Sequence, residues 1–131
     1  MIVGHIGAGS SVDYEIQKSL RFRASASAYL SRTPTVAGNR KTWTWSGWVK
    51  RGKSGAAYFM FGKTANNTNV GTVVSGIQFT ASDNLEVYSY TYGTGVTVDL
   101  ISSQVFRDYS GWYHIVVDMD TTQATASNSV S

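Results

Sequence analysis

The feature that most constrains this chain is the alternation of side chains in residues 42–51, TWTWSGWVKR. In an extended strand, Trp43, Trp45 and Val49 fall on one face and Trp48 falls on the other. Alternation over this length predicts a strand with one face in a core. We therefore expect Trp43 and Trp45 in the core. Trp48 is expected on the outer face, where an exposed ring either stacks on a ligand or packs against a second subunit.

Comparable short segments recur along the chain, and none of them has a helical period. The pair Asp83-Asn84 separates two of these segments as a hairpin turn would. Trp112, at the start of the last segment, is expected in the core. Seven or eight strands separated by turns at spacings of about 8–12 residues predict an all-β fold, an antiparallel β-sandwich or jelly roll. The predicted strands cover residues 19–23, 26–33, 42–51, 56–62, 75–82, 85–92, 96–102 and 112–120.

The 131 residues form at most one domain with a single core. Residues 1–17 are expected to be an N-terminal arm that lies against a neighbouring subunit, and residues 18–131 to be the sandwich. The chain has no cysteine, which excludes disulfides and thiolate metal sites. No apolar run approaches the roughly 20 residues of a membrane helix, so membrane insertion is not expected.

The net charge of +3 conceals an uneven distribution. Ten of the eleven basic residues lie between Lys18 and Lys63, and six of the eight acidic residues lie from Asp83 onward. This asymmetry suits head-to-tail assembly or an anionic partner, although strand faces in solvent can also carry unlike charges. The basic stretch from Arg40 to Lys53 is interleaved with tryptophans, as in grooves that bind single-stranded nucleic acid. Because at least two of these tryptophans point inward, nucleic acid is not the expected partner.

Four blocks in order together resemble the laminin-G-like, concanavalin A-like lectin and glucanase modules: SLRFRASASAYLSRTP, NRKTWTWSGWVKRG, SQVFRD and WYHIVVDMDTTQATASN. The likeness covers residues 19–128 and is greatest to versions in structural proteins of tailed bacteriophages. It implies a jelly roll in a virion, as a tail fibre, appendage or capsid decoration, assembled in the host cytoplasm with copies of itself and other virion proteins. Such modules often contact glycans.

The chain departs from the family pattern at its C-terminal end. Family members usually continue past TTQATASN into a strand resembling LYVNG and at least one more, whereas this chain ends at SVS. Either the module is truncated, or a partner strand covers the open edge, for example the arm of residues 1–17 from a neighbour. An uncovered sheet edge would otherwise favour aggregation.

Three tyrosines, Tyr88, Tyr90 and Tyr92, share one face of a predicted strand. Tyrosine combines an apolar ring with a hydroxyl, a pairing that suits the apolar faces and hydroxyls of a sugar, but it also commonly covers a half-exposed sheet. The resemblance implies ligand binding on the concave face of the sandwich. Tyr88, Tyr90, Tyr92 and Trp48 are therefore candidates for a glycan site or a subunit interface.

An enzymatic role is not expected. The related glucanases use a motif resembling E-x-D-x-x-E, whereas this chain has only Glu15 and Glu86, neither in such a pattern. Asp118 and Asp120 share a strand face, but they occupy a strand end where a solvated turn is the simpler reading. His114 is expected to be structural.

No cofactor or metal site is assigned. Laminin-G modules often bind calcium through loop carboxylates and carbonyls. Asp83 with Asn84, or Asp118 with Asp120, could contribute ligands, but no loop concentrates enough oxygen atoms. The leading hypothesis is thus a bacteriophage virion structural protein, and the alternative is an adhesion module that binds glycans of the host surface.

Overall fold

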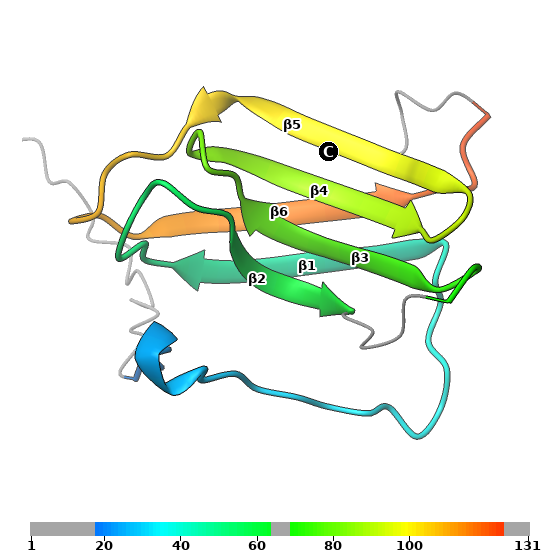
Figure 1. Ribbon diagram of the computed structural model, residues 1–131, viewed down its shortest axis with the longest axis horizontal. Coiled ribbons are helices and arrows are strands. Elements are labelled where there is room, and N and C mark those ends of the chain that lie inside the picture. Colours follow the sequence, from blue (N-terminus) through cyan, green and yellow to red (C-terminus); the bar gives the residue numbers. More distant parts are fainter. Residues whose placement is uncertain (1–17, 64–68, 125–131) are drawn as a thin grey trace, which may run out of the picture. The chain divides into compact units, whose positions relative to one another are not determined.

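The computed structural model describes residues 18–63 and 69–124 (Figure 1). The chain divides into two compact units, residues 1–38 and residues 39–131, and each is described by itself. The predicted N-terminal arm, residues 1–17, lies outside the described residues.

The described part of the first unit contains no strand. Its one regular element is a short 3-10 helix, Ala24–Ala26, which ends at Ser27 in a left-handed conformation (φ 48°). The predicted strands at 19–23 and 26–33 are therefore wrong for this structure. The physical reason is that a segment with an alternating pattern forms a β-strand only when its backbone hydrogen-bonds to the edge of a neighbouring strand. The apolar residues of this unit are accordingly open to solvent, with Leu20 70% and Tyr29 79% exposed.

The second unit consists of two antiparallel sheets. Strands β1 and β6 form one sheet, and β2, β3, β4 and β5 form the other in that order. This arrangement confirms the predicted all-β sandwich, while its jelly-roll connectivity and its concanavalin A-like likeness stay predictions. The strands are β1 (Thr42–Val49), β2 (Tyr58–Lys63), β3 (Val73–Phe79), β4 (Asn84–Thr91), β5 (Gly95–Val105) and β6 (Tyr113–Asp120).

The hairpin between β3 and β4 is present, but its turn lies earlier than predicted. Thr80 accepts a hydrogen bond from the backbone N–H of Asp83 (3.1 Å), and Asn84 already belongs to β4. Asp83 has a positive φ of 70°. The turn therefore spans residues 80–83, with Asp83 in the left-handed position that aspartate and asparagine tolerate better than most residues.

The core lies between the two sheets and follows the predicted alternation. Its buried side chains come from β3, β4 and β6: Ile77, Phe79, Val87, Ile115, Val117 and Met119. Trp43 and Trp45 of β1 are partly buried and pack against this cluster. The ring of Trp45 also lies 6.0 Å from that of Phe61 on β2, which joins the two sheets.

Trp112 is not in the core, contrary to expectation. It precedes β6 by one residue and is 51% exposed. In β6 the inward positions are Tyr113, Ile115 and Val117, so the period of two places residue 112 on the outer side. Tyr113 occupies the place expected for the tryptophan, with its ring 5.2 Å from that of Phe106.

Candidate functional site

The outer face of the four-stranded sheet carries a group of aromatic side chains. Val87 of β4 points into the core, so its neighbours in the alternation, Tyr88 and Tyr90, point outward. Phe59 of β2 meets the ring of Tyr88 edge-on at 6.4 Å between centroids. Tyr92, just beyond β4, meets Tyr90 edge-on at 5.0 Å. We call Phe59, Tyr88, Tyr90 and Tyr92 the aromatic surface.

Two glycines make room for this surface. Gly62 of β2 and Gly76 of β3 are paired across the sheet, and the ring of Phe59 lies over both. A Cβ atom at Gly76 would lie 2.3 Å from Phe59 Cε2, and one at Gly62 would lie 2.8 Å from Phe59 Cζ. The bare backbone at this pair therefore lets the ring lie close against the sheet.

Polar groups lie beside the aromatic rings. Gln78 of β3 donates a hydrogen bond from Nε2 to Oε2 of Glu86 on β4 (2.6 Å). Asp99 of β5 is paired with Tyr88 across the sheet. Partial burial, reinforced by the Glu86 carboxylate, raises the pKa of the Tyr88 hydroxyl above its usual value of 10.0. The neutral form of the Tyr88 hydroxyl is thus favoured, in the neighbourhood of the Glu86 carboxylate and the ring of Phe59.

Trp48 does not join the tyrosines. It lies on the outer face of the β1–β6 sheet, is 52% exposed and stacks on His114 at 4.9 Å between centroids. His114 Nε2 in turn lies 3.1 Å from Ser46 Oγ. The four candidate residues are thus divided between the outer faces of two different sheets, and one small ligand cannot contact both groups.

The acidic candidates serve local structure. Asp118 accepts a hydrogen bond from Thr44 Oγ1 across the β1–β6 pair (2.6 Å). Asp120 accepts from Thr122 Oγ1 (2.6 Å) and from its backbone N–H (2.9 Å), and these bonds lower the pKa of the Asp120 carboxyl. Within residues 18–63 and 69–124, no three acidic, histidine or cysteine side chains come together as a metal site would need. The same residues contain no helix long and apolar enough to cross a membrane.

The free edge of β6 is a feature that the strand pattern alone did not locate. The backbone N–H of Thr121 donates to the carbonyl of Lys41 at the end of β1 (2.8 Å). Since backbone groups alternate in direction along an antiparallel strand, the even-numbered residues His114, Val116 and Asp118 direct their N–H and C=O groups to the other edge. No strand among the described residues pairs with that edge.

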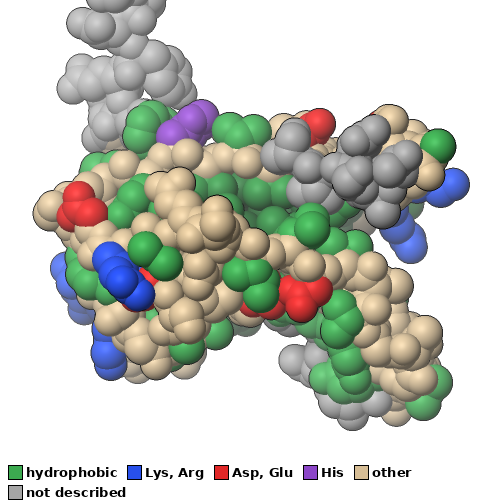
Figure 2. All heavy atoms as spheres, turned by 90° about the horizontal axis from the view of Figure 1, so that it is seen from above, with side chains coloured by type: hydrophobic (Ala, Val, Ile, Leu, Met, Phe, Trp, Pro, Cys, Tyr) green, Lys and Arg blue, Asp and Glu red, His purple; other side chains and the backbone are tan. Residues whose placement is uncertain are grey.

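An apolar groove runs beside this edge. In Figure 1, β6 lies behind β3 and β4, and β5 extends beyond it. The groove has a volume of about 310 Å³, and Figure 2, seen from above Figure 1, shows hydrophobic side chains in a recess on that side. Leu100, paired with the core residue Val87, is directed to the same side and is only partly covered. The groove is lined by Leu85, Val87, Leu100, Ile101, Ser102, Val116 and Val117.

One member of the basic stretch is used inside the protein. Arg51, which is 5% exposed, places its Nη2 atom 2.9 Å from Oδ1 of Asp83. The N–H is not directed at that oxygen, so the contact is an ion pair without a hydrogen bond. Arg107 Nε donates to the other carboxylate oxygen at 3.2 Å. This internal pairing removes one of the cations from any nucleic-acid surface.

Comparison with known proteins produced no match, whether with family models, curated proteins or solved structures. The resemblance to the laminin-G-like modules therefore stays a prediction from the quoted sequence blocks.

Proposed function

We propose that this protein is a structural subunit that assembles with other copies of itself through the open edges of its β-sandwich, as part of a bacteriophage particle. The observation that carries the assembly is the two-stranded sheet of β1 and β6. The described residues leave this sheet without a neighbour on either side, next to an apolar groove. The phage setting is supported by the sequence resemblance, and detection of the chain by mass spectrometry in purified virions would test it.

The physical basis of the proposal is the cost of an unpaired edge. A free strand edge offers backbone donors and acceptors that readily pair with another chain. Charged side chains on an edge strand oppose pairing with another chain, but the middle of β6 carries the uncharged, half-exposed Val116. Pairing of an added strand with this edge would satisfy the backbone groups and cover the apolar groove at the same time.

The experiment is the solution mass of the full chain, measured by light scattering on a sizing column. We expect one discrete oligomer for the wild type and a monomer for Val116→Pro. Proline at residue 116 removes an N–H that points to the free edge and leaves the bonds to β1 in place. Val116→Ala keeps the N–H and is the matched control, expected to stay oligomeric. A wild type that runs as a well-behaved monomer contradicts the proposal.

A second candidate function, glycan binding, is favoured by the aromatic surface. Its rings lie beside the Gln78 amide and the Glu86 carboxylate, and sugars are bound by such combinations of apolar faces and polar acceptors. Tyr88→Ala with Tyr90→Ala should abolish binding to a glycan array and leave the solution mass unchanged. Trp48→Ala is the control, since it lies on the other sheet. Loss of binding with Trp48→Ala instead would place the site elsewhere.

A further inference from the structure

We propose that the free edge of β6, next to the groove, binds residues 18–23, KSLRFR, of a second copy as an added antiparallel strand. This inference rests on the proposed function and names its contact. Among the described residues, the β6 edge has no neighbouring strand and residues 18–23 pair with no strand, and the two match in apolar pattern and in charge.

The geometry of the groove favours a single extended segment. Because β5 extends beyond β6, an incoming chain must pass beneath β4 and β5 to reach the β6 edge (Figure 1). One strand fits there, since its backbone pairs with β6 and its inward side chains face the groove. The β6 edge of a second complete sandwich would instead bring its own overhanging β5 against this one. The occupant is therefore an arm rather than another sheet.

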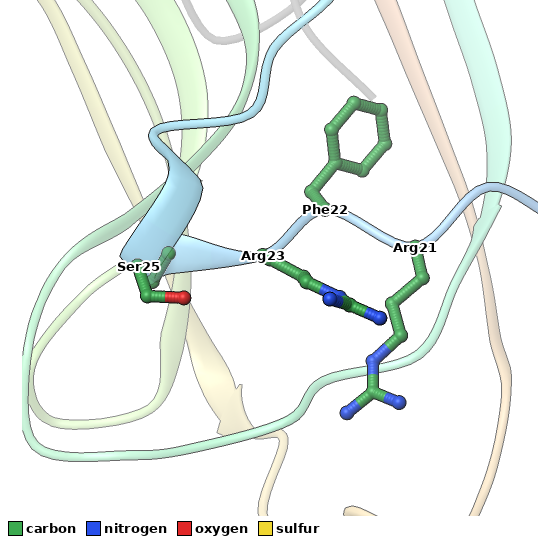
Figure 3. A pocket seen from close by; sticks show the side chains of 5 residues that line it. Arg21, Phe22, Arg23 and Ser25 are labelled. Atoms are coloured by element: carbon green, nitrogen blue, oxygen red, sulfur yellow. The ribbon is translucent and has the colours of Figure 1, made fainter.

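The segment has the pattern of a strand without a partner. Leu20 and Phe22 alternate with Arg21 and Arg23, and Figure 3 shows Phe22 directed away from the side to which both arginine side chains point. The backbone at Arg23 is extended, with φ −93° and ψ 120°. Yet Leu20 and Phe22 remain largely exposed, and no strand forms. A strand-like sequence with an uncovered apolar side needs an edge to pair with.

The charges of the two partners are complementary. On the outer face of β6, Asp118 and Asp120 are two residues apart, as are Arg21 and Arg23 in the segment. Within the described residues, neither arginine and neither aspartate has an ion-pair partner. Antiparallel pairing of Arg23 with Asp118 also places Arg21 opposite Asp120.

The same register satisfies the backbone and the core. Asp118 and Asp120 are even-numbered, so their N–H and C=O groups point to the free edge and form the hydrogen-bonded pairs. Phe22 then lies opposite Met119, on the inward side of the strand and next to Val117, which lines the groove. Leu20 lies opposite Thr121, one residue past the end of β6, and is turned to the same inward side as Phe22, whereas both arginines are turned outward.

Site-directed cross-linking tests the contact directly, because the natural chain contains no cysteine. Full-length Arg23→Cys is mixed with full-length Asp118→Cys, one of them carrying an affinity tag, and the mixture is oxidised. Hydrogen-bonded antiparallel neighbours have Cα atoms about 5.5 Å apart, within the range of about 4.4–6.8 Å that disulfides accept. We expect a tagged–untagged heterodimer to form faster than with the control pair Arg23→Cys and Asp99→Cys, since Asp99 is on β5, on the outer face of the other sheet.

Charge reversal provides a second measurement on the same pair. Arg23→Asp and Asp118→Arg should each weaken self-association by about fivefold, the value of an exposed ion pair near 1 kcal/mol. The double variant, in which the charges are exchanged, should recover it. If self-association of the double variant is as weak as that of either single variant, the pairing of Arg23 with Asp118 is overturned.

The outcomes separate this inference from the proposed function. If the wild type assembles but the mixture of Arg23→Cys and Asp118→Cys cross-links no faster than the control pair, the inference alone is overturned. A disulfide formed only within one chain of an Arg23→Cys, Asp118→Cys double variant overturns the assignment to a second copy. A monomeric wild type, together with no cross-link between Arg23→Cys and Asp118→Cys, overturns both the inference and the proposed assembly.

Discussion

Replacing Arg51 by methionine should destabilise this protein more than any other single change to its ion pairs. Arg51 follows β1, and its buried guanidinium lies against the β3–β4 turn. It pairs with Asp83 of the β3–β4 turn, donates to the carbonyl of Phe106, and lies over the ring of Phe79 at 4.5 Å. Methionine has similar length and no charge, so the substitution removes the ionic contacts with little loss of volume.

The magnitude follows from burial. Asp83 is buried, and without Arg51 its carboxylate keeps only Arg107, whose side chain is 67% exposed. Removing one member of a buried pair costs about 3–5 kcal/mol, because the other charge is left uncompensated. This is a large part of the roughly 5–15 kcal/mol that stabilises a typical domain. Arg107→Met is the matched control: it removes an exposed partner of the same carboxylate and should cost about 1 kcal/mol or less.

The assay is urea unfolding followed by tryptophan fluorescence, with the slope of the transition compared between variants. A double variant, Arg51→Met with Asp83→Asn, should recover about 2 kcal/mol or more of the lost stability. The unpaired Asp83 carboxylate is then absent, and asparagine tolerates the left-handed backbone at this position. The reasoning is refuted if Arg51→Met costs no more than Arg107→Met, or if the two changes in the double variant are simply additive.

Three further predictions concern other features. Gly76→Ala should lower the free energy of unfolding in urea by about 1–3 kcal/mol, because the new methyl group displaces the ring of Phe59. The loss should be much smaller in a Phe59→Ala background, and an equal loss there would contradict the close packing. Asp120 has a lowered pKa, so its contribution to stability is complete above pH 3.8 and is lost as the pH falls below that value. The difference in urea midpoint between the wild type and Asp120→Asn should therefore shrink between pH 6 and pH 2.5, and a constant difference would oppose this account. Tyr88 should ionise above pH 10.0 in an ultraviolet titration, and Glu86→Gln should lower that pKa part of the way, whereas no change would show that burial alone raises it.

The strands of the second unit were predictable because each has one face in the core. In β1 the alternation of Trp43 and Trp45 with polar residues is preserved in the structure, and so is the outward position of Trp48. The prediction was wrong for residues 19–23, which alternate equally well but have no paired edge in this structure. Periodicity reports which side chains would share a face, and only long-range pairing decides whether the strand forms.

Single-residue errors had a different cause. Trp112 was expected in the core, but Ile115, Val117 and Met119 determine which side chains of β6 point inward. A count backward from those three residues would have placed Trp112 outside. The buried pair of Arg51 and Asp83 had no such signal, since its members are far apart in sequence and each looks like a solvent-exposed charge.

The pairing of β1 with β6 also determines when this fold can be completed on the ribosome. Thr44 and Asp118, which bond across the pair, are separated by 74 residues. At synthesis rates of about 5–20 residues per second, β6 is completed roughly 4–15 s after β1. During that interval the strand with three of the four tryptophans has no partner. The yield of folded protein should therefore depend on the temperature and rate of expression, because both control how long this strand can misassociate before its neighbour is made.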